Sequence, residues 1–162
     1  MSGYNLLTED YHLVMGLSPV ADAFADDTVR SDIVNMKNYH SFGGIVFWGV
    51  GTTGTLTITV QACDDISGTN TTAIPFKYRV ITGAINAVDT HGALTQATAA
   101  GVLTTAGSHQ MVVVEVSAEE LGDTGYGYAR IAIEETTDSP LLGGIILFQG
   151  KPRYNVTDST LT

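Results

Sequence analysis

Apolar and polar side chains alternate through the middle of this 162-residue chain, and the period of two predicts β-strands. In "TLTITVQAC", Leu56, Ile58 and Val60 fall on one face, while Thr57 and Thr59 fall on the other. The same alternation runs through "PFKYRVIT", "QMVVVEV" and "YGYARIAIE", and an earlier strand is expected in "VRSDIVNM". "GGIVFWGV" and "GGIILFQG" are continuous apolar runs, which predict strands that are covered on both faces.

Turn-forming clusters such as "DDISGTNTT" and "GDTGYG" separate these runs, a pattern that is typical of an all-β fold. We therefore expect an antiparallel β-sandwich or jelly roll with extended N- and C-terminal arms. Helical signals are few. Ser117 to Glu120 matches a capping box, with Gly122 placed to end a single turn. The Ala-rich segment 84–101 fits a helix or a long loop, and its weak periodicity favours the loop.

The two ends of the chain lack the alternation of its centre. We expect an N-terminal arm over residues 1–27, one β-sandwich domain over 28–150 and a polar tail over 151–162. The N-terminus has neither the basic region nor the apolar core of a signal peptide, and the longest apolar stretch, 141–148, is too short to span a bilayer. We expect no membrane partner.

The charge is sparse and acidic, with seven Lys and Arg against 17 Asp and Glu and a net charge of −10. Nucleic-acid backbones bind clustered basic side chains, and here the basic residues are scattered, so we expect no nucleic-acid partner. Cys63 is the only cysteine, which excludes an intrachain disulfide. Its position at a strand end predicts an inert small side chain.

One motif suggests a cofactor. "GVGTTG", residues 49–54, matches the G-x-G-x-x-G of dinucleotide-binding loops. That site needs a helix directly after the glycines, but "TLTITV" follows and has the period of a strand. We therefore interpret the loop as a β-hairpin turn between strands 43–50 and 54–63, with glycines that adopt positive φ. No cofactor is expected.

Other candidate sites are weaker. Asp64 and Asp65, with Ser67 and Asn70, could form an oxygen-rich Ca²⁺ shell, but the spacing fits no EF-hand and favours a solvated loop. The following candidates also lack the spacing of a metal or catalytic site: the pairs Asp26-Asp27, Glu119-Glu120 and Glu134-Glu135, and the histidines His12, His40, His91 and His109. We name no catalytic, cofactor or metal residues.

Aromatic residues offer two further interpretations. Tyr126 or Tyr128 could form a tyrosine corner, although the offset from the preceding turn is loose. Trp48 and Tyr39 could stack on a sugar ring at the surface. A core or interface position is favoured for Trp48, because it lies within an apolar run.

Several segments together resemble a known class of proteins: "VNMKNYHS", "GVGTTGTLTITVQACDD", "TTAIPFKYR", "GYGYARIAIEE" and "SPLLGGIILFQGKPRY". Over most of residues 13–154 the chain resembles head-associated structural proteins of tailed bacteriophages, of the decoration or cement type. The resemblance implies a sandwich or jelly-roll subunit, often a homotrimer, that binds the major capsid protein on the outer surface of a head assembled in the host cytoplasm. It carries over no functional residues.

The leading hypothesis is therefore a capsid decoration protein that stabilises a bacteriophage head without catalysis. The alternative is a carbohydrate-binding or receptor-binding β-sandwich module of a phage particle, based on loop Asp, Asn and Tyr residues. An enzyme, such as a hydrolase, is the third hypothesis, and no nucleophile–base pair supports it.

Overall fold

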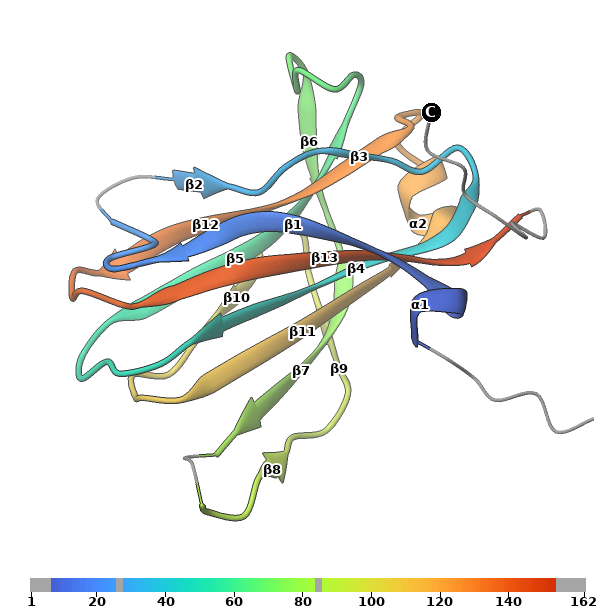
Figure 1. Cartoon of the computed structure of the whole chain (residues 1–162). Helices are drawn as coiled ribbons and strands as arrows, with labels where there is room; N and C mark the ends of the chain where they lie inside the picture. The colour runs from blue at the N-terminus through green and yellow to red at the C-terminus, as the bar shows by residue number, and fades with distance from the viewer. Residues whose placement is uncertain (1–6, 26–27, 84–85, 154–162) are drawn as a thin grey trace, which may run out of the picture.

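A computed structural model describes residues 7–25, 28–83 and 86–153 of the chain. Its strands form two antiparallel sheets that pack face to face, as Figure 1 shows. This arrangement confirms the predicted all-β sandwich. Helices are limited in the described residues to α1 (Leu7–Asp10) and α2 (Ala118–Gly122). Neither is long or apolar enough to cross a membrane.

Sheet A has the strand order β1-β13-β4-β11-β7-β8, and β9 also pairs with β7. Its strands are β1 (Tyr11–Val20), β4 (Tyr39–Trp48), β7 (Phe76–Thr82), β8 (Thr90–His91), β9 (Thr95–Ala97), β11 (Gln110–Ser117) and β13 (Gly143–Pro152).

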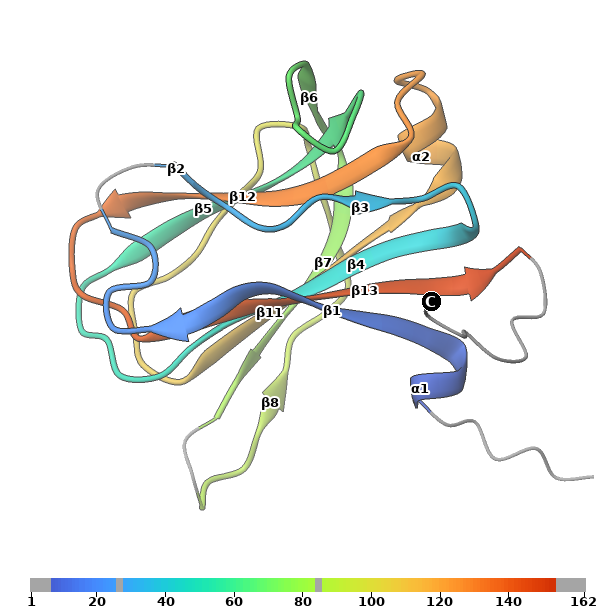
Figure 2. The same cartoon turned by 45° about the horizontal axis from the view of Figure 1, so that its top comes forward.

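Sheet B has the order β10-β5-β12-β2, with β3 beside β12 and β6 beside β5. Its strands are β2 (Thr28–Arg30), β3 (Val34–Asn35), β5 (Thr55–Cys63), β6 (Thr71–Ile74), β10 (Val102–Leu103) and β12 (Tyr128–Thr137). Figure 2 shows β12, β5 and β2 in a layer separate from β1 and β13.

The path of the chain between the sheets is that of a jelly roll. It alternates from β1 in sheet A to β2 and β3 in sheet B, then to β4 in A and β5 in B. After an insertion it continues through β10 in B, β11 in A, β12 in B and β13 in A. The first and last core strands are neighbours, as in a jelly roll. The connectivity therefore selects the jelly roll from the two predicted architectures.

The core lies between the sheets and follows the predicted alternation. In sheet B, Ile58 pairs with Ile133, and Val60 pairs with Ile131. All four side chains are fully buried, because their strands turn one apolar face toward sheet A. The threonines between them on β5 face outward and are half-buried.

The prediction of an N-terminal arm over residues 1–27 is wrong for Tyr11–Val20. These residues form β1, which pairs with β13 along most of its length. The strand carries apolar side chains on both faces, so it shows no alternation. At the other end, Lys151 and Pro152 of the predicted tail belong to β13. Residues 1–6 and 154–162 of the predicted arms lie outside the described residues.

The loop "GVGTTG" joins strands of different sheets, so the predicted β-hairpin is wrong. β4 ends at Trp48 in sheet A, and β5 begins at Thr55 in sheet B. Positive φ is not the reason for its glycines, since none of them is among the residues with positive φ. The reason is close packing: a Cβ on Gly51 or Gly54 would crowd the side chain of Leu141.

Two local predictions hold. The segment 84–101 is not helical where it is described, and it carries the short strands β8 and β9 beside β7. The capping box is formed: the Ser117 hydroxyl accepts from the Glu120 backbone N–H at 3.3 Å, and the Glu120 carboxylate accepts from the Ser117 backbone N–H at 3.0 Å. It begins α2 at the connection from β11 to β12.

Candidate interaction surface

The outer face of sheet B is polar. Thr57 and Thr136 share a hydrogen bond between their hydroxyls at 2.7 Å, and Arg130 Nε donates to Gln61 Oε1 at 2.8 Å. Both bonds join side chains of the paired strands β5 and β12. This face has the ordinary character of a sheet whose second side is solvated.

The outer face of sheet A has the opposite character. Residues directly opposite one another on paired strands share a face, so the register identifies its members. We define the apolar face as the outward side chains Leu13, Met15, Ile45, Phe47, Ile81, Met111, Val113, Ile146 and Phe148. They come from β1, β4, β7, β11 and β13, which lie side by side in Figure 1.

None of the side chains of the apolar face is buried in the monomer. Leu13 is 45% exposed and Met15 is 59% exposed, and the remaining members are half-buried. The apolar runs of β4 and β13 predicted strands that are covered on both faces. Among the described residues, only the inner face of each strand is covered. The outer face is therefore the candidate site for contact with a partner.

Glycine pairs give the apolar face its shape. The runs "GGIVFW" of β4 and "GGIILF" of β13 pair antiparallel, so that each glycine pair lies opposite the bulky end of the other run. A Cβ on Gly43 would overlap the ring of Phe148, and one on Gly144 would lie 3.3 Å from the ring of Phe47. Each outward ring thus lies over a glycine of the neighbouring strand.

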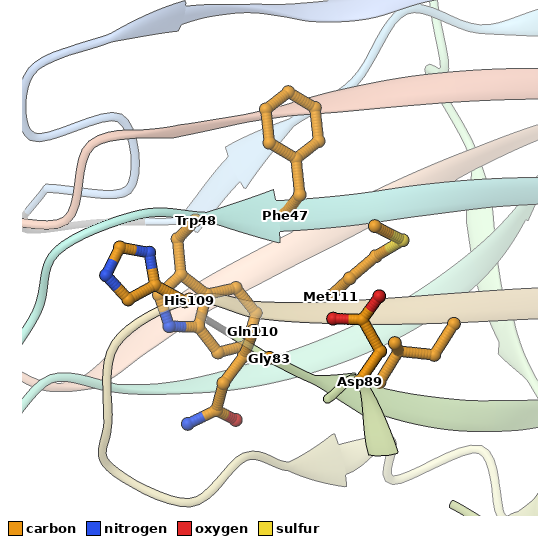
Figure 3. Close-up of a pocket in the computed structure, with 8 residues that line it drawn as sticks. Phe47, Trp48, Gly83, Asp89, His109, Gln110 and Met111 are labelled. Atoms are coloured by element: carbon orange, nitrogen blue, oxygen red, sulfur yellow. The ribbon is translucent and has the colours of Figure 1, made fainter. Parts of the chain in front are cut away.

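A shallow pocket of about 270 Å³ opens at one end of the apolar face. Phe47 and Met111 line it from the apolar face, and in Figure 3 their side chains point to the side opposite that of Trp48 and Gln110. Asp89 also lines the pocket. The Gln110 amide donates to the Thr105 carbonyl at 3.2 Å, while its Oε1 is buried without a partner among the described residues.

The serine nearest in sequence to the pocket-lining His109 is bonded to the backbone of the "GVGTTG" loop. Ser108 is adjacent to His109, but its hydroxyl donates to the Gly51 carbonyl at 2.5 Å and accepts from the Gly51 N–H at 3.0 Å. The His109 N–H in turn donates to the Gly49 carbonyl at 2.6 Å. These bonds join the loop "GVGTTG" to the two residues before β11. The Ser108 hydroxyl therefore stabilises the conformation of the loop.

The carboxylates of Asp64 and Asp65 accept hydrogen bonds from other residues of their own loop. Asp64 accepts from the Asn70 backbone N–H at 3.0 Å and from the Asn70 side-chain amide at 2.6 Å. These bonds lower the pKa of Asp64 below its ordinary value of 3.8. Asp65 accepts from the Ser67 N–H at 2.8 Å. The arrangement is a hydrogen-bonded turn, in agreement with the solvated-loop interpretation.

Cys63 lies beneath this loop and is buried. Burial raises the pKa of its thiol above the ordinary value of 9.0, and the nearby Arg130 opposes that effect only in part. The burial of Cys63 fits the predicted small side chain at a strand end. Among the described residues, no three His, Cys, Asp or Glu side chains meet in a group that could hold a metal ion.

The aromatic candidates do not form a sugar-binding platform. Trp48 is only 3% exposed, and its indole N–H donates to the Gly107 carbonyl at 3.0 Å, which confirms a core position. Tyr39 lies at the opposite end of β4 and contacts His12, with ring centroids 6.1 Å apart. Tyr126 packs against the core, and the described part of the chain contains no hydroxyl hydrogen bond from Tyr126 or Tyr128 that would make a tyrosine corner.

Comparison with known proteins gives little further information. No family model matches the chain, and no curated protein matches it. The solved structures that match include VP2 of infectious bursal disease virus in its subviral particle and structures of the Gx and Gt strains of that virus. Identities are 13%, 13% and 14%, each with a TM-score of 0.28, and the matches cover 88%, 88% and 92% of this chain. The chain spans 42% of the length of each of these chains. A likeness at this level does not assign a function.

Proposed function

We propose that this protein is a non-enzymatic structural component of a virus particle, a decoration subunit that binds the outer surface of a bacteriophage head and stabilises it. The apolar face carries the proposal. Five strands expose aliphatic and aromatic side chains on one side of the jelly roll, and such a face serves to bind another protein surface.

Three further observations support this proposal. The jelly roll is a common architecture of capsid proteins, although the same fold also occurs in lectins and therefore does not identify the role by itself. Ser108, next to the pocket-lining His109, has its hydroxyl bonded to the Gly51 backbone. The net charge of −10 would keep densely arrayed subunits from adhering to one another through their exposed sides.

The test is binding to heads that lack this protein. Heads of the virus that encodes the chain, produced without it and emptied of DNA, are mixed with the purified protein and sedimented. We expect saturable binding at a fixed number of copies per head, together with greater resistance to heat and osmotic shock. Binding that disappears at moderate salt, or heads whose resistance does not change, would refute the role.

The carbohydrate-binding alternative rests on loop Asp, Asn and Tyr residues, and Trp48, a separate candidate for stacking on a sugar ring, is buried. A glycan array probed with and without Ca²⁺ would still detect it. Specific glycan binding without head binding would replace the proposed function with this one.

A further inference from the structure

We propose that the outer face of sheet B carries an anion-binding site at Arg130, and that its ligand is a singly charged carboxylate. The two sheets pack face to face, so this site lies on the side of the jelly roll opposite the apolar face (Figure 2). It therefore goes beyond the proposed binding to a head and does not depend on it.

Arg130 is a nearly buried cation on an otherwise solvated face. It lies opposite Gln61 in the register of β12 and β5, and its Nε donates to Gln61 Oε1 at 2.8 Å. Its side chain is only 9% exposed. Arginines are rarely buried to this degree unless their charge is paired, because removing a charge from water is costly. The surroundings of the guanidinium therefore indicate what would pair with it.

Two segments of the chain cover Arg130. A Cβ on Gly68 would lie 2.8 Å from Arg130 Nη1 and 2.9 Å from Ile33 Cδ1, so both side chains lie against this glycine. Gly68 has a φ of 62°, and its N–H donates to the Asp65 carbonyl at 3.2 Å. The loop before β6 and the segment before β3 thus hold the guanidinium in one place.

The terminal nitrogens of Arg130 have no partner in the described part of the chain. Its one hydrogen bond there is that of Nε, and no ion pair joins it to a described carboxylate. Asp64 and Asp65 accept from their own loop instead. Among the described side chains, Gln110 Oε1 is the one nitrogen or oxygen that is buried without a partner, so Nη1 and Nη2 must both reach the surface. Solvent therefore meets a fixed fork of free donors.

The chemistry of this fork selects the ligand. The parallel N–H groups of a guanidinium match the two oxygens of a carboxylate, which they bind more strongly than neutral acceptors. Burial is the main cause of the raised pKa of Cys63 beside Arg130, and the charges of Asp64 and Asp65 add to it. These two charges are thus close to the site. They repel a doubly charged phosphate more than a singly charged carboxylate.

NMR titration of the Arg130 Nε–H signal with sodium acetate tests the site, with sodium chloride used to hold the ionic strength constant at neutral pH. We expect a saturable shift with a dissociation constant on the order of 10 mM, as for one or two charge-assisted hydrogen bonds. Inorganic phosphate should bind about threefold more weakly or worse. Arg30 is the internal control, since it is exposed on sheet B and its signal should shift little and linearly.

Gln61→Glu should abolish most of this binding. The new carboxylate has the size of the amide that already accepts from Arg130 Nε, so it pairs with the guanidinium from within the fold. We expect acetate affinity to fall about tenfold or more. Thr57→Glu is the matched control: it adds the same charge to an outward position of β5 about 13 Å away, where salt screens it, and affinity should change by about twofold or less.

A blocked Gly-Glu-Gly peptide, titrated in the same way, distinguishes two sources of the carboxylate. Binding tighter than that of acetate assigns the site to a protein side chain, and equal or weaker binding assigns it to a small organic acid. An Arg130 shift as linear as that of Arg30, unchanged affinity in Gln61→Glu, or phosphate binding as tight as acetate would overturn the inference. Acetate binding that appears only in Asp65→Asn would also overturn it, because the loop carboxylate would then occupy the guanidinium in solution.

Discussion

Leu141 offers a direct test of why "GVGTTG" contains glycines. Its side chain is 1% exposed and rests on Gly51 and Gly54, where it fills the space that their missing Cβ atoms leave. The Leu141 carbonyl also accepts from the Ala23 N–H at 2.9 Å, which fixes the backbone at this point. Leu141→Ala therefore leaves a cavity that the neighbouring backbone is poorly able to fill. We expect a loss of about 3 kcal/mol in the free energy of unfolding.

Urea unfolding, followed by the fluorescence of the single buried tryptophan, Trp48, measures this loss. The midpoint should fall while the slope with urea stays constant, and the melting temperature should drop by about 6–12 °C. Leu142→Ala is the control, because the adjacent Leu142 is 54% exposed and should change stability by about 0.5 kcal/mol or less. Both variants are compared at one protein concentration, since association adds to apparent stability. If Leu141→Ala costs no more than Leu142→Ala, the packing explanation of the glycines is wrong.

Three further predictions follow from individual contacts. Gly43→Ala should cost about 1–3 kcal/mol, because the new methyl group meets both the Phe148 ring and a backbone carbonyl, and adding Phe148→Leu should recover only part of the loss in urea unfolding. Ser117→Ala should cost about 1 kcal/mol through loss of the helix cap, whereas Ser117→Asp should stay near the wild type in the same assay. Asn70→Ala should raise the pKa of Asp64, as followed by NMR titration. Since the folded-state pKa of Asp64 is depressed, its contribution to stability is present above pH 3.8 and is lost as the pH falls through the lower folded value, so the difference between wild type and Asn70→Ala should shrink in acid.

Periodicity predicted most strands but not the sheet to which each belongs. Alternation in β5 indicates which side chains face inward, and Ile58 and Val60 are buried as expected. It does not indicate whether the next strand pairs with β4 or crosses to the other layer. The six residues of "GVGTTG" suit either connection. What selects the crossover is packing with Leu141, which lies far along the chain and is invisible to a local pattern.

The sequence pattern did not predict β1, for a related reason. Leu13 and Met15 point outward, while Val14 packs against the core, so both faces of the strand are apolar and "HLVMGL" shows no alternation. Irregular register after Met15 shortens the regular stretch further. The same property marks β4 and β13, which were recognised only because their apolar runs are longer. In all three strands the outer residues are apolar, although the opposite sheet packs only against the inner face.

The acidity of the chain and its apolar face together predict how the proposed head contact responds to salt. Subunits with a net charge of −10 repel one another when they crowd on a head, and salt screens that repulsion. The contact itself gains from the burial of apolar area, which salt does not weaken. The dissociation constant for heads should therefore fall as NaCl rises, and it should fall further in sulfate. A contact held by ion pairs, such as Lys77 or Arg79 with acidic groups of the capsid, would weaken under the same conditions. Sedimentation of heads with the protein across a salt series separates the two cases, and a dissociation constant that rises with NaCl would show that the apolar face does not provide the main attraction.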